Sequence, residues 1–133
     1  MGKIRVLLAD DHQAVRERVR GLLGEDFEVV GAVENGREAV VAALRLNPDV
    51  LVIDISMPVL NGLQATEQLH AANQGTKVVF LTVHEDPDFV AAALSAGASG
   101  YVVKANVTTD LIPAIRDAIE GRIYVSQSIT RRT

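Results

Sequence analysis

Five short apolar segments recur along the chain and predict the strands of one sheet. They occupy residues 4–9, 27–33, 50–55, 77–83 and 100–103. Most are rich in β-branched residues and lack the apolar–polar alternation of a strand with one solvated face. Strands buried on both faces have this composition, and they belong to parallel sheets that helices cover on both sides.

The segments between these strands carry apolar residues at helical spacing, which predicts five amphipathic helices. The stripes comprise Val15, Val19, Leu22 and Leu23; Ala39, Val40, Ala43 and Leu44; Leu63, Thr66 and Leu69; Val90, Ala93 and Leu94; and Leu111, Ile115, Ala118 and Ile119. Strands that alternate with helices in this way indicate an α/β protein, a (βα)₅ doubly wound fold with a five-stranded parallel sheet.

Residues that start or stop helices stand where these elements should begin and end. Asn47-Pro48 closes the second helix, because a residue before proline is pushed out of the helical region. Asp86-Pro87 is typical of an N-cap followed by a proline in the first helical position, and Gly97 and Gly121 fall at C-cap positions.

The beginning of the last helix is less well marked. We expect Thr108 or Thr109 to cap it, with Pro113 lying early inside the helix at some cost in stability.

Composition narrows the possible functions. The 133 residues suffice for one domain, and the absence of cysteine excludes disulfides, thiolate metal sites and thiol nucleophiles within the chain. A formal charge of −4 argues against a domain that binds nucleic acid by itself. The first apolar segment is too short for a secretion signal and no segment has membrane length, so we expect a cytoplasmic protein without membrane contact.

The chemistry is predicted to converge at the carboxyl ends of the strands, where doubly wound sheets bind their ligands. The first strand ends in Asp10 and Asp11, the third in Asp54, the fourth in Thr82 and the fifth in Lys104. Taken singly, each is more ordinary: an acidic pair can cap a helix, an aspartate can make a turn, and a lysine is usually solvated. Their coincidence at one edge of one sheet favours a functional site.

This set of groups is suited to accepting a phosphoryl group. Three crowded carboxylates repel one another unless a cation or protons intervene, and carboxylate oxygens prefer Mg²⁺ or Mn²⁺ to softer metals. A carboxylate can act as nucleophile toward phosphorus, while Mg²⁺, the Lys104 ammonium and the Thr82 hydroxyl neutralise the phosphoryl oxygens.

With these residues placed, the chain resembles the receiver domain of bacterial two-component response regulators over essentially its whole length. The matching segments are LLADDH, VLVIDISMPVLNGL, VVFLTVHED and GYVVKA. The segment in which Asp54 is followed by Met57, Pro58 and Gly62 is the most specific. The resemblance implies a flavodoxin-like fold with strand order 2-1-3-4-5.

The resemblance also implies the roles of the acidic residues and of the lysine. Asp54 would be phosphorylated by a sensor histidine kinase. Mg²⁺ would be bound by Asp11, Asp54 and the backbone carbonyl of Ser56, with Asp10 acting through water, and Lys104 would pair with the phosphoryl oxygens. The domain would assist its own phosphorylation and dephosphorylation without being a turnover enzyme.

Other residues would carry the signal or set its duration. Thr82 would bond to the phosphoryl group and Tyr101 would swing inward behind it, which shifts the face formed by the fourth helix, fifth strand and fifth helix. Ser56 and His84 occupy positions that tune the dephosphorylation rate. Many family members have proline after the lysine with a cis peptide bond, but this chain has Ala105, which leaves the isomer open.

Within the family, the second half of the chain resembles the NarL/FixJ branch, whose receivers precede LuxR-type helix-turn-helix domains. Residues 1–124 would form the receiver, and residues 125–133 would begin a linker to a DNA-binding output domain outside this sequence. The whole protein would then be a transcriptional regulator that forms a phosphorylation-dependent homodimer. A stand-alone receiver is the alternative.

The sequence disfavours three other classes of protein. A haloacid-dehalogenase-type phosphatase needs a DxD motif after its first strand, whereas Asp10 and Asp11 are adjacent and His12 follows. A flavodoxin-like cofactor binder needs a phosphate-binding loop there, and the acidic residues would repel it. A receiver-like module that no longer takes phosphate is disfavoured by the intact set of site residues.

Overall fold

The computed structural model describes residues 2–72 and 75–130, which form one parallel sheet and its covering helices. The elements are β1 (Ile4–Ala9), α1 (Gln13–Leu23), β2 (Phe27–Val33), α2 (Gly36–Leu46), β3 (Val50–Ile53), α3 (Gly62–Ala71), β4 (Lys77–Thr82), α4 (Pro87–Ser95), β5 (Gly100–Val103), a 3₁₀ turn (Lys104–Asn106), α5 (Val107–Ile119), β6 (Tyr124–Val125) and α6 (Gln127–Thr130). The predicted (βα)₅ order is confirmed.

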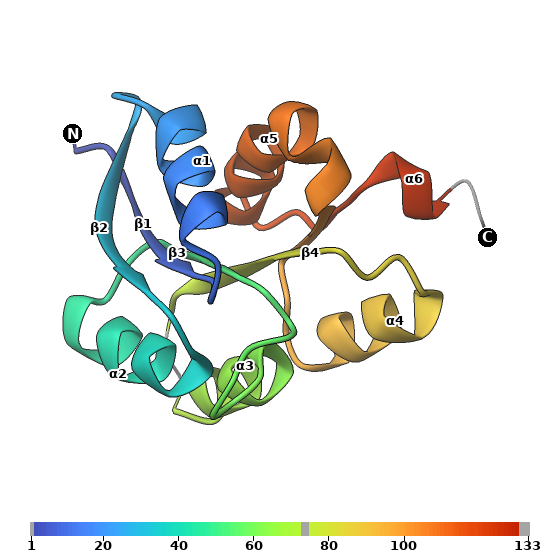
Figure 1. Ribbon diagram of the computed structural model, residues 1–133, viewed down its shortest axis with the longest axis horizontal. Helices are drawn as coiled ribbons and strands as arrows, with labels where there is room; N and C mark the ends of the chain where they lie inside the picture. Colours follow the sequence, from blue (N-terminus) through green and yellow to red (C-terminus); the bar gives the residue numbers. More distant parts are fainter. Residues whose placement is uncertain (1, 73–74, 131–133) are drawn as a thin grey trace.

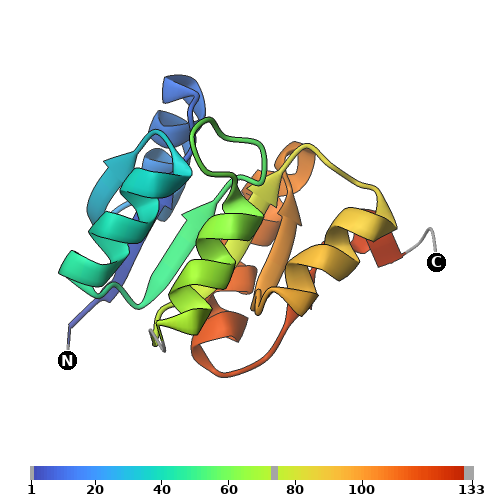
Figure 2. The ribbon, with the colours of Figure 1, turned by 90° about the horizontal axis from the view of Figure 1, so that it is seen from below.

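The sheet has the order β2-β1-β3-β4-β5-β6 with every pair parallel. Helices α1 and α5 cover one face, and α2, α3 and α4 cover the other (Figure 1). Figure 2, seen from below, shows α2, α3 and α4 side by side across the second face. The predicted strand order 2-1-3-4-5 is confirmed, and β6 extends it by one strand.

Alternate residues of the central strands supply the two cores. On β4, Val79 and Leu81 pack with α1 and α5, whereas Val78 and Phe80 pack with α2, α3 and α4. All four residues are at most 4% exposed. This explains why the strands lack apolar–polar alternation, because both of their faces are dry.

The predicted helix ends are confirmed at four places. Asn47 follows α2 in the left-handed region, with φ 48°. Asp86 caps α4 by accepting a hydrogen bond from the N–H of Asp88 at 2.9 Å. Gly97 and Gly121 follow α4 and α5 with φ of 103° and 82°, a conformation that glycine adopts without a Cβ penalty.

The expected cap of α5 is wrong. The helix begins at Val107, so Thr108 and Thr109 lie inside its first turn, and the Thr109 hydroxyl donates back to the carbonyl of Asn106 at 3.2 Å. The reason is the 3₁₀ turn that leads straight from β5 into α5 and leaves no extended residue where a threonine could cap. Every described peptide bond is trans, and this includes the Lys104–Ala105 bond, whose isomer the sequence left open.

Two elements near the end of the described chain were not expected. The two-residue strand β6 pairs with β5, with Tyr124 opposite Gly100 and Val125 opposite Tyr101. The short helix α6 follows, and its Ile129 is only 3% exposed. Neither segment is long enough to show helical or strand periodicity in the sequence.

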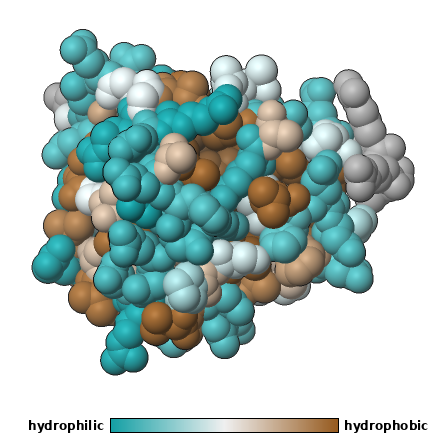
Figure 3. Space-filling model, in the orientation of Figure 1, coloured by the Kyte–Doolittle hydropathy of each residue, from teal (hydrophilic) through white to brown (hydrophobic). Residues whose placement is uncertain are grey.

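The surface is mostly polar on the face that Figure 3 shows, with apolar side chains in small separate groups. Exposed large apolar residues of the described chain are Val41, Leu44, Val59, Val83, Ile119 and Ile123. None of the described helices combines the length and apolar character that crossing a membrane would require.

Candidate functional site

The candidate site lies where β1 and β3, the neighbours at the centre of the sheet, reach their carboxyl ends. The backbone N–H of Asp10 donates to Val33 of β2, and that of Asp54 donates to Ala9 of β1, each at 3.1 Å. These bonds continue the sheet ladder by one residue past each strand. After Asp10 the chain enters α1 on one face of the sheet, and after Asp54 it continues to α3 on the other face. The two carboxylates therefore lie in the crevice between these diverging connections.

Lys104 joins these two carboxylates. Its Nζ lies 2.9 Å from Asp10 Oδ2 and 3.0 Å from Asp54 Oδ2. Asp10 and Asp54 are 5% and 4% exposed, so both charges are largely removed from water. Burial lowers the pKa of Lys104, but its hydrogen bonds to Asp10 and Asp54 outweigh burial and raise that pKa above its ordinary value.

The second oxygen of Asp54 is in a different position. Oδ1 is buried and accepts no hydrogen bond from any residue that the structure describes. A buried carboxylate oxygen without a donor is costly, so this atom is suited to bind an additional group.

The loop after Asp54 folds back closely on it. The N–H of Gly62 donates to Ile55 at 2.8 Å, and a Cβ on Gly62 would lie 2.1 Å from the carbonyl oxygen of Asp54. Only glycine fits at this first position of α3, which accounts for the spacing between Asp54 and Gly62.

Asp11 stands apart from the buried pair and is accompanied by a residue to which the sequence assigned no role. His12 Nδ1 lies 3.2 Å from Asp10 Oδ1 and 3.1 Å from Asp11 Oδ1. Asp10, Asp11 and His12 each place one possible ligand atom within 4.8 Å of the others. Asp10 Oδ1 also accepts from the backbone N–H of His12 at 2.9 Å, which fixes the turn into α1.

Arg16 is a further residue that the sequence did not single out for the site. Its Nη1 donates to the backbone carbonyl of Asp10 at 2.7 Å, and Nη2 lies 3.5 Å from Glu34 Oε1. Only its position one turn into the helix after Asp10 could have indicated this contact.

The charges in this site are unbalanced, and this is the test of whether a cation fits. Asp10, Asp11 and Asp54 carry three negative charges against the single positive charge of Lys104, which leaves −2 among these four side chains. A divalent cation matches that excess, and carboxylate oxygens are hard ligands suited to Mg²⁺. The residues present therefore fit a bound Mg²⁺.

The remaining predicted residues form a second group beside the first. Thr82 and Tyr101 are both fully buried, and the Tyr101 hydroxyl donates to the backbone carbonyl of His84 at 2.8 Å. The N–H of His84 makes a long hydrogen bond of 3.4 Å to Thr82 Oγ1. Burial is the main reason that the pKa of Tyr101 is raised, and the negative charges of Asp54 and Asp86 add to it.

Ser56 and His84 are joined directly. Ser56 Oγ and His84 Nε2 lie 2.7 Å apart, and the imidazole stacks on Phe89 with ring centroids 4.3 Å apart. The two predicted rate-tuning positions therefore form one bridge from the loop after β3 to the beginning of α4.

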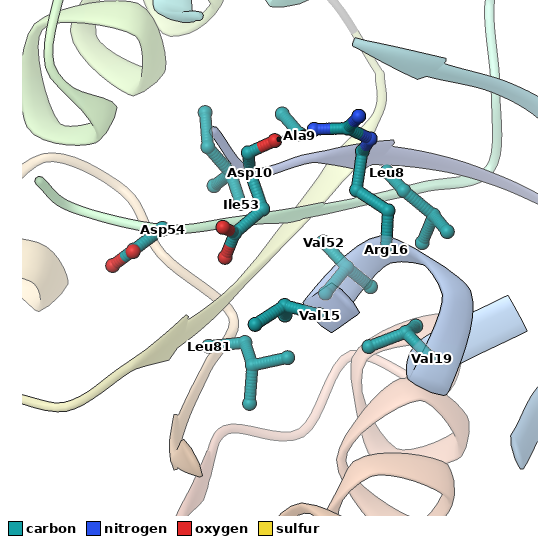
Figure 4. Close-up of a pocket in the computed structure, with 10 residues that line it drawn as sticks. All are labelled: Leu8, Ala9, Asp10, Val15, Arg16, Val19, Val52, Ile53, Asp54 and Leu81. Carbon is teal, nitrogen blue, oxygen red and sulfur yellow. Dashed lines mark hydrogen bonds between the residues drawn. The ribbon is translucent and has the colours of Figure 1, made fainter. Parts of the chain in front are cut away.

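Two spaces adjoin the site. A cavity of about 10 Å³ lies on its α1 side, where Asp10 and Asp54 meet Arg16 and apolar side chains (Figure 4). It holds at most one water molecule, so it admits no phosphoryl donor. A wider groove of about 550 Å³ is lined by Asp11, Ser56, Met57 and Phe89 among others, and it gives access from solvent.

Comparison with known proteins agrees with this geometry. The response regulator receiver domain family matches residues 6–116. DegU of Brevibacillus brevis, a transcriptional regulatory protein, is 38% identical over 130 residues, covering 96% of this chain and 55% of DegU. The chain spans 55–64% of the length of several curated relatives that it matches.

Solved structures give the same result. A LuxR-family response regulator from Aurantimonas sp. SI85-9A1 has a TM-score of 0.92 at 31% identity, covering 98% of this chain and 94% of that one. The isolated receiver of RcsB from Salmonella enterica serovar Typhimurium, solved with the phosphomimetic BeF₃⁻, has a TM-score of 0.88 at 27% identity, covering 98% of both chains. The chain therefore belongs to the two-component response regulator receiver family, and its LuxR-family relatives agree with the NarL/FixJ branch.

Proposed function

We propose that this receiver accepts a phosphoryl group from a sensor histidine kinase onto Asp54, with Mg²⁺ bound beside it. The observation that carries the proposal is the arrangement of Asp54, whose Oδ2 is held by Lys104 while Oδ1 is buried without a partner among the described residues. The Lys104 ammonium thus orients Oδ2 of Asp54, and Oδ1 is available to an incoming group.

The transfer would form one bond and break one. A carboxylate oxygen of Asp54 attacks phosphorus, and the P–N bond of the phosphohistidine breaks with its electron pair going to the imidazole, which is then reprotonated from solvent. Lys104 Nζ, which contacts both Asp10 and Asp54, would pair with the phosphoryl oxygens. The products are an aspartyl phosphate and a free histidine on the kinase.

Asp11, Asp54 and the backbone carbonyl of Ser56 would hold Mg²⁺ directly, and Asp10 would bind it through water. Bound Mg²⁺ supplies positive charge that neutralises the phosphoryl oxygens as the bond to Asp54 forms. The uncompensated charge of −2 among the acidic residues and Lys104 supports this assignment.

The switch would run through Thr82 and Tyr101. The Thr82 hydroxyl would turn toward the phosphoryl group and favour the inward position of Tyr101, altering the face of α4, β5 and α5. Tyr101 is already fully buried, with its hydroxyl on the carbonyl of His84, so the inward position is available to the chain. The domain would promote its own phosphorylation and dephosphorylation as a signalling device, without turning over a separate substrate.

We propose further that the receiver controls a DNA-binding output domain in a longer protein. Its curated relatives exceed its length, DegU is named a transcriptional regulator, and a similar structure is of the LuxR family. Residues 1–124 would be the receiver, residues 125–133 would begin the linker, and phosphorylation would promote a cytoplasmic homodimer. DNA contact would belong to the output domain, since a charge of −4 disfavours it here.

The test is phosphorylation by acetyl phosphate and Mg²⁺, followed by intact mass. Wild-type protein and Asp26→Asn, a matched change at an exposed aspartate, are expected to gain one phosphoryl group. Asp54→Asn and wild type with excess EDTA are expected to gain none. If the wild type gains nothing, beryllofluoride binding with Mg²⁺ separates a short-lived phosphate from an inert site, and absence of both results would overturn the proposal.

A further inference from the structure

Residues 124–129 lie docked along the outer edge of β5, the strand that carries Tyr101 and ends next to Lys104. The N–H of Tyr124 donates to Ser99 at 3.2 Å, and the N–H of Ser126 donates to the carbonyl of Tyr101 at 3.0 Å. A strand of only two residues is short for a sheet, so other contacts must hold this segment in place.

Asp110 of α5 provides such contacts. Its Oδ1 accepts from the Tyr124 hydroxyl at 2.9 Å, and its Oδ2 accepts from the Ser126 hydroxyl at 2.7 Å. Ser126 Oγ in turn accepts from the N–H of Val103 at 3.0 Å, and Ser126 is fully buried. The segment therefore satisfies a buried backbone donor of β5 at the residue before Lys104, which would otherwise be left without this bond.

Ile129 anchors the other end of the segment. Its side chain is 3% exposed and belongs to the apolar cluster that contains Tyr101 and Val103 of β5 and Val90 and Ala93 of α4. Burying an isoleucine side chain removes apolar surface from water, which favours the docked position of the segment.

Tyr101 is linked to the docked segment by its backbone carbonyl, which accepts from Ser126, and by the apolar cluster that it shares with Ile129. The Tyr101 ring points toward β4, with its centroid 6.4 Å from that of Phe80 and its hydroxyl on His84. Because β4 and β6 lie on opposite sides of β5, a ring that turned away from β4 would move toward β6 and α6. On that side Val125 lies opposite Tyr101 in the ladder, and Val125 and Ile129 pack with the same apolar cluster as the ring, so the docked segment favours the inward ring.

We propose that residues 124–129 are a latch whose docking on β5 is coupled to the state of the Asp54 site through Tyr101. Loading here means phosphorylation of Asp54 or binding of beryllofluoride to it. The inference rests on the proposed function, since it takes the inward position of Tyr101 as the one that loading of Asp54 favours. Loading the site would then tighten the latch, and releasing the latch would weaken loading by the same factor, because coupling between two binding equilibria is reciprocal.

Hydrogen exchange on the whole chain tests whether loading the Asp54 site tightens the latch. With Mg²⁺ and beryllofluoride, compared with Mg²⁺ alone, we expect the amides of residues 124–129 to exchange about five-fold more slowly or better, the lower end of ordinary coupling between sites. The amides of residues 100–104 report separately whether the ring of Tyr101 responds.

An amide NMR titration with beryllofluoride at fixed Mg²⁺ tests whether releasing the latch weakens loading of the Asp54 site. Ile129→Ala is expected to weaken apparent affinity about five-fold or more. Ile123→Ala, the same change at a 63% exposed residue just before the latch, is expected to leave the affinity unchanged. Asp110→Asn should act like Ile129→Ala while sparing the apolar core, which covers the case in which Ile129→Ala unfolds.

The outcomes separate the two proposals. The latch proposal is wrong if exchange slows at residues 100–104 but not at 124–129. It is also wrong if Ile129→Ala and Ile123→Ala bind beryllofluoride with the same affinity. In either case the phosphoacceptor function stands. If the wild type binds no beryllofluoride and no amide responds, the proposed function fails and the latch fails with it.

Discussion

At the scale of single residues, the decisive feature is the difference between the two oxygens of Asp54. Oδ2 is held by Lys104 at 3.0 Å, whereas Oδ1 is buried and receives no hydrogen bond from the described residues. Lys104 also holds Asp10, so one ammonium balances two buried carboxylates. One charge cannot satisfy both, and the remaining negative charge makes the site receptive to a cation.

Gly62→Ala is expected to destabilise the domain, because the new Cβ would lie 2.1 Å from the carbonyl oxygen of Asp54. Overpacking of this kind costs about 1–3 kcal/mol and would displace the Asp54 loop. Gly21→Ala is the matched control: it lies inside α1 with open space around its Cβ, and it should stabilise the protein by about 0.5–1 kcal/mol. Urea unfolding measures both, and a neutral Gly62→Ala would contradict the prediction.

His84→Ala is expected to shorten the lifetime of the aspartyl phosphate severalfold. The imidazole is held beside the site by Ser56 Oγ and by the ring of Phe89, and its removal opens a path for water. Decay of phosphorylated protein, followed by intact mass after the donor is removed, measures the lifetime. Ser56→Ala releases the same imidazole without deleting it and should have a smaller effect in the same direction. An unchanged lifetime in His84→Ala would refute the role of this ring.

At the scale of elements, most strands are held by ladders and two cores, but β6 depends on side chains. Its two residues pair with β5, and Asp110 of α5 binds both Tyr124 and Ser126. Burial and the hydrogen bond to Asp110 raise the pKa of Tyr124 to about 12. The hydrogen bond from the protonated Tyr124 hydroxyl to Asp110 therefore helps to stabilise this edge of the sheet.

This shift predicts how stability depends on alkaline pH. The folded pKa of Tyr124 is about 12 against an unfolded value of 10.0, so its contribution is fully present below pH 10.0 and is lost as the pH rises toward 12. Tyr124→Phe should cost about 1 kcal/mol near neutral pH, and its stability should fall less steeply than that of wild type over this alkaline range. Urea unfolding at several pH values gives both slopes, and parallel slopes would contradict the assignment.

At the scale of the whole molecule, the doubly wound sheet concentrates charge at one edge. Asp10 and Asp54 directly follow the neighbouring strands β1 and β3, and Lys104 directly follows β5, on the far side of β4. Parallel strands bring their carboxyl ends to the same edge, so residues 50 positions apart in the chain meet within 3.0 Å.

Mg²⁺ should stabilise the folded chain, because the unfolded chain does not gather the acidic residues. At about ten times its dissociation constant, a ligand of the folded state adds about 1.4 kcal/mol to the free energy of unfolding. For a domain of this size the melting temperature would rise by several degrees. Scanning calorimetry with and without Mg²⁺ measures the shift, which Asp54→Asn and Asp11→Asn should reduce and Asp26→Asn should not. A wild type that melts at one temperature in both conditions would argue against the site.

The sequence by itself determined the order and type of the main elements and which residues end the strands. Apolar periodicity and helix-end signals at Asn47, Asp86, Gly97 and Gly121 are local properties of the chain, and parallel-sheet geometry converts strand ends into one shared edge. This much was enough to name Asp54 and Lys104 as neighbours.

Only the tertiary structure decided which atoms meet. The Ser56–His84 bond, the reach of Arg16 to Asp10 and the capture of Tyr124 by Asp110 join residues from different elements, and each depends on how those elements pack. The start of α5 and the docking of residues 124–129 were missed for the same reason. Both segments are too short to have a periodicity of their own, so β5 and α5 fix their conformation through long-range contacts.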